Sequence, residues 1–157
     1  MTTALILLGC PELPVQTSLT LYLLSGLKDA GIEVVVAGTD AALKLLEVAD
    51  PKGHYVDPAE LHNLDTCIES LAERRRDFDL CAVFVHSDTG LSYLGTVQGI
   101  SKARLVAIIF GREADVLAKQ ITFECETLVA KAVHNPSPFK KRIDRLVEEV
   151  KQWAVSR

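Results

Sequence analysis

The sequence lacks most of the motifs that indicate a cofactor, a metal ion or a reaction. It contains no GxGxxG or GxxxxGK[ST] loop, so the usual signatures of dinucleotide and P-loop nucleotide binding are missing. It also has no GxSxG turn of a serine hydrolase. The four cysteines form no CxxC pair and no zinc-finger spacing with the histidines, so we expect no metal site and reduced thiols. These cysteines are Cys10, Cys67, Cys81 and Cys125.

Long apolar runs are missing as well. No stretch approaches the roughly 20 apolar residues that are needed to span a bilayer. The apolar run before Cys10 is shorter than the core of a signal peptide, and no basic residue precedes it. Together with reduced thiols, this pattern predicts a cytoplasmic protein without a membrane partner.

Positive charge is scarce. Lys and Arg number 17 against 21 Asp and Glu, which gives a net charge of −4. The whole chain therefore shows no electrostatic footprint for nucleic acid, and we expect no such partner. The only basic run, Arg74-Arg75-Arg76, is predicted to close a helix, because cations complement the carbonyl end. A phosphate-binding patch is the alternative interpretation.

Short apolar runs are what the sequence does contain. Residues 4–8, 80–85 and 105–110 each end at Gly or His and lead through a polar turn into a helix-like pattern. Residues 33–37 form a similar run. Apolar runs that alternate with helices are typical of buried parallel strands. The 157 residues therefore predict a single α/β domain over residues 1–157, with three α/β/α layers. The sheet is expected to be mostly parallel or mixed, doubly wound and similar to flavodoxin or cobalamin-binding domains.

Several local signals add detail to this outline. Asp57-Pro58 followed by Glu60 predicts the capped start of a helix, and residues 54–56 are predicted to form a short strand. Gly95 and Gly99, four residues apart in a predicted helix, indicate close packing on the sheet. Residues 121–133 are compatible with an alternating edge strand over 121–126 or a more continuous strand over 128–133. The direction of this strand is left open by the pattern.

The site is expected at the carboxyl ends of the strands, where open α/β sheets bind their ligands. Residues 86–90 form the best candidate loop, because amides at the start of the following helix can hold an anion. The alternative is that one polar residue of this loop caps the helix while the others face solvent. The predicted ligand-binding residues are Gly9, Cys10, Thr39, Asp40, His86, Ser87, Asp88, Thr89, Gly90 and Arg112.

Cys10 could also carry chemistry. It follows the first strand and precedes a helix, a position typical of reactive thiols. His86 or His134 would then act as the base of a thiol-dependent enzyme. Against this, the segment after Cys10 has no arginine and Glu12 would repel an anion, so a packing role is the alternative.

The chain shows two resemblances to known families. The opening strand, the turn Gly9-Cys10-Pro11-Glu12-Leu13-Pro14 and the following helix resemble the start of cobalamin-binding domains. The Asp-x-His-x-x-Gly segment of those domains is missing here. Over its whole length the chain resembles a family of uncharacterised archaeal proteins found in methanogens. That likeness rests on the same turn, on the loop at 86–90 and on residues 133–138. It implies an archaeal cytoplasmic protein with a three-layer fold, and no established activity or cofactor.

Three functions are compatible with these features. The incomplete set of catalytic groups favours a module that binds a small anionic ligand. The second hypothesis is a homodimeric or accessory subunit. Leu21 and Leu24 extend the apolar surface of the first helix beyond one stripe, which predicts a subunit contact, with deep burial of the helix as the alternative. The third hypothesis is the enzyme that uses Cys10.

Overall fold

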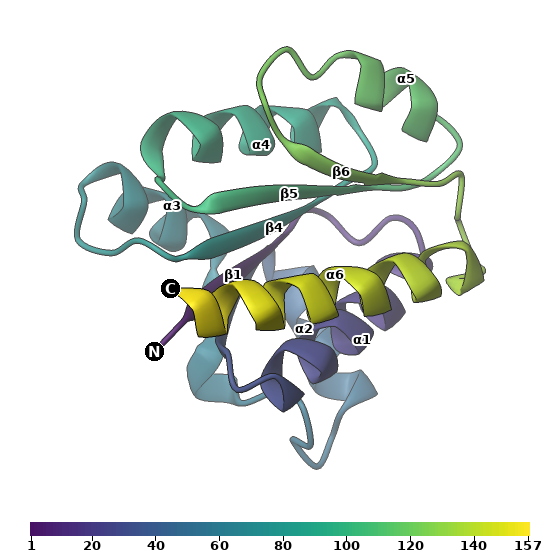
Figure 1. Ribbon diagram of the computed structural model, residues 1–157. Helices are drawn as coiled ribbons and strands as arrows, with labels where there is room; N and C mark the ends of the chain where they lie inside the picture. Colours follow the sequence, from purple (N-terminus) through teal and green to yellow (C-terminus); the bar gives the residue numbers. More distant parts are fainter.

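Six parallel strands form one sheet in the order β3-β2-β1-β4-β5-β6. Figure 1 labels β1, β4, β5 and β6 of this sheet. The computed structural model describes residues 1–157. Without the short β3, the order is that of flavodoxin-type folds, and β3 extends it to the order of dinucleotide-binding folds. The fold class predicted from the sequence is confirmed, and the sheet contains no antiparallel pair. The strands are β1 (Thr3–Leu8), β2 (Glu33–Gly38), β3 (Leu61–Asn63), β4 (Leu80–Val85), β5 (Arg104–Ile109) and β6 (Glu126–Val129).

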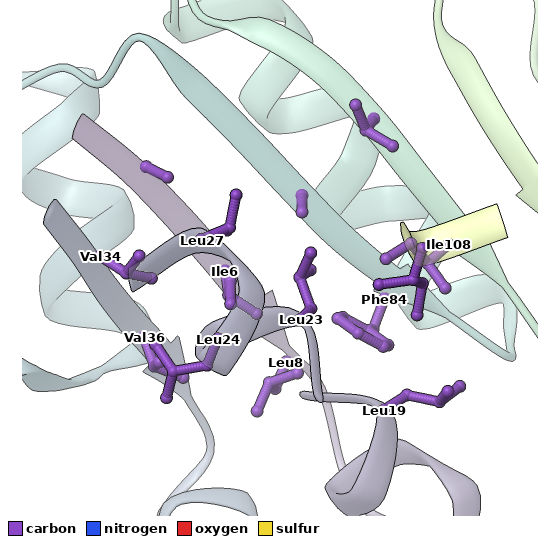
Figure 2. Close-up of a cluster of buried hydrophobic side chains, with 14 of the residues drawn as sticks. Ile6, Leu8, Leu19, Leu23, Leu24, Leu27, Val34, Val36, Phe84 and Ile108 are labelled. Carbon is purple, nitrogen blue, oxygen red and sulfur yellow. The ribbon is translucent and has the colours of Figure 1, made fainter. Parts of the chain in front are cut away.

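Helices cover both faces of the sheet. The helices are α1 (Val15–Asp29), α2 (Asp40–Ala49), α3 (Leu64–Ala72), α4 (Asp88–Ile100), α5 (Ala114–Lys119) and α6 (Ser137–Ser156). Helices α1, α2 and α6 bury one face, around side chains such as Ile6 and Phe84 (Figure 2). Helices α3, α4 and α5 bury the other face, around Leu5 and Val83. Because successive strand residues point to opposite faces, the central strands must be apolar throughout.

The connection between β2 and β4 differs from the prediction. Residues 54–56 form a loop, because the carboxylate of Asp50 accepts hydrogen bonds from the amides of His54, Tyr55 and Val56 at 2.8–2.9 Å. Asp57 caps only the short 3-10 turn Pro58–Glu60, and β3 follows directly. Helix α3 starts later, where the side chain of Asn63 accepts bonds from the first amides. Glu60 forms an ion pair with Lys28 of α1 at 3.0 Å rather than a capping box.

The segment after α5 also differs from either alternative. The sheet member is β6, which straddles the two predicted ranges and runs parallel to β5. Glu126 at its start forms an ion pair with Arg104 at 2.9 Å. Phe123 and Cys125 pack against the core under α3, α4 and α5 without joining the sheet. Both predicted ranges for this strand were therefore wrong in their bounds.

Two leucines of α1 have different environments. Leu24 is 1% exposed and belongs to the core between α1 and the sheet (Figure 2), so the prediction that it lies in a subunit contact is wrong. Leu21 is half-buried at the edge of the same core. Of the predicted pair, only Leu21 is available to a partner.

Arg74, two residues after the end of α3, has an unusual backbone conformation. Its φ is +58°, in the left-handed region that glycine normally occupies at this position. The amide of Arg75 donates to the carbonyl of Ser70 at 2.9 Å, and that of Arg74 to Leu71 at 3.1 Å. This is the Schellman pattern of helix termination. The basic run therefore lies just past the helix rather than in its last turn.

No helix of the structure combines the length and the apolar character that crossing a membrane requires.

Candidate functional site

The ends of β1 and β4 lie side by side at the point where the sheet changes its direction of winding. The chain leaves β1 toward β2 on one side and leaves β4 toward β5 on the other. Doubly wound folds bind ligands between the two loops that diverge at such a switch point, and we call this place the candidate crevice. Here the two loops are residues 9–14, after β1, and residues 86–87, after β4.

His86 is the most unusual polar residue at this edge. Its side chain is 8% exposed, and its ring centroid lies 5.2 Å from that of Phe110. Its Nε2 atom is buried without a hydrogen-bond partner. The nearest charged group is the Glu12 carboxylate, whose Oε2 lies 3.6 Å away, which is too far for a hydrogen bond. Buried polar atoms are rarely left unpaired, so this nitrogen is a natural contact for a ligand.

The start of α4 lies directly after His86. Ser87 occupies the N-cap position with extended backbone, and its hydroxyl makes no capping hydrogen bond. The amides of Asp88, Thr89 and Gly90 consequently have no hydrogen-bond partner within the chain. Free amides at the start of a helix attract anions, and the helix dipole adds to the attraction. The capping alternative for this loop is therefore wrong for Ser87.

Gly90 brings α4 close to the strand that precedes it. A Cβ atom at this position would lie 3.1 Å from the Cα of Val85 and 3.5 Å from the carbonyl oxygen of Phe84. A larger residue would push the first turn of α4 away from the end of β4. The glycine thus sets where the free amides lie relative to His86.

The loop after β1 crosses over the end of β4. A Cβ atom on Gly111, the second residue after β5, would lie 2.8 Å from Leu13 Cδ1 and 3.7 Å from His86 Cβ. Gly111 has a φ of +91°, which suits glycine. The amide of Val15 then donates to the carbonyl of Val133 at 3.0 Å, which ties the end of this loop to the segment after β6. The loop therefore covers the strand ends and places Glu12 opposite His86.

Gln16, in the first turn of α1, is a second buried polar residue near this edge. It is 1% exposed, and its Nε2 donates to the carbonyl of Gly9 at 3.2 Å. Its Oε1 atom is buried and has no partner. Gly9 also accepts a bond from the hydroxyl of Thr39 at 3.5 Å. The end of β1 is thus held by side chains from α1 and from the end of β2.

Thr39 and Asp40 have structural roles in this arrangement. Thr39 caps α2, because its hydroxyl accepts a bond from the amide of Ala42 at 3.3 Å. Asp40 is exposed and accepts a bond from the side chain of Asn63 at 3.3 Å, at the end of β3. Both residues lie at the predicted edge. The bond from Asn63 engages Asp40 toward the β2–β3 side, whereas Thr39 also bonds to Gly9 at the end of β1.

The predicted thiol–imidazole pair is not assembled by a hydrogen bond. Cys10 is exposed, and its thiol makes no hydrogen bond to either His86 or His134. His134 is exposed after β6. The structure also contains no group of three or more His, Cys, Asp or Glu side chains that could hold a metal ion.

Arg112 is a cation at the same edge. It is exposed, follows Gly111 after β5 and forms no ion pair. Its charge is therefore not neutralised by a carboxylate of the chain. A groove of about 710 Å³ lies elsewhere, between α1, α6 and the loop at Asp50, and does not include these residues.

Sequence reasoning missed Gln16, Phe110 and Gly111. Gln16 occupies the helical face that also carries Thr20, Leu23 and Leu27, so its burial becomes apparent only once the phase of α1 is known. Phe110 lies in the apolar run 105–110, where the sequence does not show that its ring meets His86. The position of Gly111 directly after a strand is the signal that could have indicated a close approach.

These features define a doubly wound α/β domain with a candidate site between its first and fourth strands. The chain belongs to the family described as "Domain of unknown function (DUF1890)", whose model matches residues 5–146. The archaeal family expected from the sequence is thereby confirmed.

Two relatives cover nearly the whole chain. It is 33% identical over 149 residues to "Uncharacterized protein MJ0452" of Methanocaldococcus jannaschii, covering 94% of this chain and 98% of the relative. It is also similar to the solved structure described as "Structure of MT0777". In that case the TM-score is 0.86 and the identity 45%, over 95% of this chain and 99% of the other. These relatives support the assignment of the fold and the family, and their descriptions name no ligand.

Proposed function

We propose that the chain binds a small anionic molecule in the crevice between β1 and β4. The observation that carries this proposal is the buried Nε2 of His86, which has no hydrogen-bond partner and lies next to the free start of α4. An anionic group placed there would accept bonds from the α4 amides. It would also accept a hydrogen bond from Nε2 of the imidazole.

Two charged residues bear on the sign of the ligand. Arg112 is an unpaired cation at the same edge and favours an anion. Glu12 disfavours an anion, because its negatively charged carboxylate lies 3.6 Å from the imidazole of His86. Its side chain is 66% exposed, so it can turn into solvent with little loss of packing. We interpret Glu12 as the internal carboxylate that a ligand anion replaces.

Thermal melting with inorganic phosphate and with succinate tests this proposal. A ligand at 100 times its dissociation constant stabilises the folded chain by about 2.7 kcal/mol, which a melting curve resolves. We expect His86→Asn to abolish the stabilisation, since it removes the buried nitrogen. His134→Asn is the matched control, because His134 is exposed near the same edge.

Two results would contradict anion binding at this crevice. One is a panel of small phosphates and carboxylates that leaves the melting temperature unchanged. The other is a stabilising anion whose effect survives substitution of His86, Ser87 and Thr89.

A second candidate function is association with another copy of the chain through α1. It is supported by Leu21, which is half-buried and lines the 710 Å³ groove together with Tyr22, Ile143 and Val147. Sedimentation of the wild type and of Leu21→Glu would test it, and we expect a dimer that the substitution dissociates. Leu45→Glu on α2 is the control, because Leu45 is 44% exposed and lies outside this groove. A monomeric wild type would exclude the candidate.

We also propose the cytoplasm as the compartment in which the chain acts. All four cysteines are free, and none is paired in a disulfide. Free thiols are typical of proteins in reducing compartments. Fractionation of the native cells, followed by detection of the chain in the soluble or the membrane fraction, tests this expectation.

A further inference from the structure

A concave surface of about 580 Å³ lies at the amino-terminal edge of the sheet, opposite the candidate crevice. It is formed where α3 and α4 end, by the segment before β4 and the segment before β5. Four cations line it, namely Arg74, Arg75, Arg76 and Lys102. This basic concavity gathers almost a quarter of the 17 Lys and Arg residues of an acidic chain.

The carboxylates near the basic concavity leave most of this charge unpaired. Asp77 is the only acidic residue that lines it. Its carboxylate accepts bonds from the hydroxyl of Ser101 at 2.5 Å and from the amides of Lys102 and Phe78 at 2.9 and 2.8 Å. Those bonds fix the two segments against each other. The Asp77 carboxylate therefore forms no ion pair with the lining cations, although its charge interacts with that of Lys102.

Three of the four cations have no carboxylate partner. Arg75 forms ion pairs with Glu73 at 2.9 Å and Glu69 at 3.8 Å. Arg74, Arg76 and Lys102 form none. The guanidinium of Arg76 lies 4.7 Å from the centre of the Phe78 ring, which orients it while its donors stay free.

The backbone of Arg74 adds an independent observation. A left-handed residue at the end of a helix is usually glycine, because every other side chain strains the backbone there. This chain instead places a long cation at the strained position, on the rim of the concavity. Backbone strain that the fold retains is a signal of function when other observations agree with it.

We infer that the basic concavity binds a small molecule that carries a diphosphate or triphosphate group. Guanidinium groups bind phosphate oxygens in a bidentate manner, and three unpaired cations match a polyanion better than a single carboxylate. The volume is in the range of small-molecule pockets. The net charge of −4 and the small size of the basic concavity favour a small ligand over nucleic acid. This site is separate from the crevice at the opposite edge.

Amide NMR of isotopically labelled protein, titrated with inorganic tripolyphosphate at physiological ionic strength, tests the inference. We expect the signals of residues 73–77 and 99–103 to shift and to saturate. Signals of residues 86–91 report the crevice separately. A shift confined to residues 86–91 would overturn the inference and leave the proposed function standing.

Substitutions then measure the contribution of each cation. We expect Arg74→Gly and Lys102→Gln each to weaken tripolyphosphate binding about ten-fold, because each removes a charged hydrogen-bond donor. Arg74→Gly suits the left-handed backbone, so the variant folds. Arg74→Lys should retain part of the affinity, because it keeps the charge and loses the bidentate geometry. Arg145→Gln is the control, because this exposed arginine of α6 does not line the concavity.

Two further outcomes would overturn the inference. One is an affinity for tripolyphosphate that is the same in the wild type, in Arg74→Gly and in Lys102→Gln. The other is an oligonucleotide that shifts the same amides at lower concentration than tripolyphosphate does, which would assign the surface to nucleic acid.

Discussion

The Nε2 atom of His86 faces Oε2 of Glu12 at 3.6 Å, although the two residues follow different strands and lie far apart in the sequence. Neither side chain has another polar contact at this point. The loop after β1 brings Glu12 there, because Leu13 packs against Gly111 and carries the loop over the end of β4. The contact therefore joins the two halves of the sheet at its switch point.

Glu12→Gln should strengthen the binding of a small anion at this crevice. A carboxylate about 4 Å from the ligand charge opposes binding by about 1 kcal/mol in a solvent-like medium, so affinity should rise about five-fold. Titration of the wild type and the variant with phosphate or succinate measures this ratio. Glu149→Gln on the exposed side of α6 is the control. A weaker affinity in Glu12→Gln would instead make Glu12 a ligand contact.

The sequence predicted the edge that carries the candidate site, because apolar runs that end in polar turns reveal buried parallel strands. The residues that surround His86 could not be predicted in the same way. Phe110 and Glu12 reach it through the path of the loop after β1 and through the order of the strands, which no local pattern encodes. The positions of the candidate residues along the chain could therefore be predicted from the sequence, but the contacts between them could not.

The errors in secondary structure have the same origin. The Asp57-Pro58 signal correctly indicates a capped turn, because Asp57 caps the turn Pro58–Glu60. The residues after this turn do not continue a helix, because they pair with β2 and form the edge strand β3. Residues 54–56 carry strand-forming side chains, yet Asp50 already binds their amides. In both places a tertiary partner overrides a local preference.

Two glycines of α4 should respond to alanine in opposite ways. A Cβ atom on Gly95 would have no neighbour within 4 Å, so the predicted close packing at Gly95 and Gly99 was wrong. Gly95→Ala should stabilise the fold by about 0.5–1 kcal/mol through helix propensity. Gly90→Ala should destabilise it by about 1–2 kcal/mol, because the new methyl group meets the backbone of β4. Urea unfolding of both variants measures the difference, and equal shifts would contradict the close approach at Gly90.

Alkylation of the native protein should label one cysteine rapidly. Cys10 is exposed, whereas Cys67 and Cys81 are buried in the core. Burial raises the pKa of Cys81 to about 12 and that of Cys125 to about 11, so few thiolates form there at neutral pH. Mass spectrometry after brief treatment with iodoacetamide should therefore find a single modification, at Cys10. Rapid labelling of Cys81 would show that the core opens.

Cys10→Ser separates the enzyme hypothesis from the binding hypothesis. If Cys10 lies beside the crevice without reacting, the variant should keep its affinity for the anion within about two-fold, which is a small free-energy change. A covalent adduct that forms on Cys10 with a substrate-like electrophile and disappears in His86→Asn would favour the enzyme instead.

Arg74→Gly should stabilise the fold. A non-glycine residue in the left-handed region carries about 1–2 kcal/mol of strain, which glycine relieves. Glycine also raises the conformational entropy of the unfolded chain, and this offsets part of the gain in folding stability. The net gain should be about 0.5–1 kcal/mol, which raises the melting temperature by a few degrees in a domain of this size. Arg74→Ala is the matched control, because it removes the guanidinium and keeps the strain. Equal stability of the two variants would show that the strain is negligible.

The stability of the fold should fall in acid through the Asp79–Arg157 pair, which ties the C-terminus to the start of β4. Hydrogen bonding to Arg157 at 2.7 Å and to the amide of Thr3 at 2.8 Å lowers the pKa of Asp79 to about 2. Because the folded pKa lies below the unfolded value of about 3.9, the contribution is complete above pH 4 and disappears between about pH 4 and 2. Linkage gives between about 2 and 3 kcal/mol, and solvent screening of this partly exposed pair reduces it to about 1 kcal/mol.

Asp79→Asn isolates this contribution in urea unfolding at a series of pH values. The variant should be less stable than the wild type by about 1 kcal/mol at pH 7. The two curves should converge as the pH approaches 2, since Asp79 is then protonated in the wild type. Asp115→Asn is the control, because the ion pair of Asp115 with Lys131 is exposed on both sides and contributes little. If the difference between wild type and Asp79→Asn is the same at pH 7 and pH 2, the aspartate acts through hydrogen bonds that do not depend on its charge.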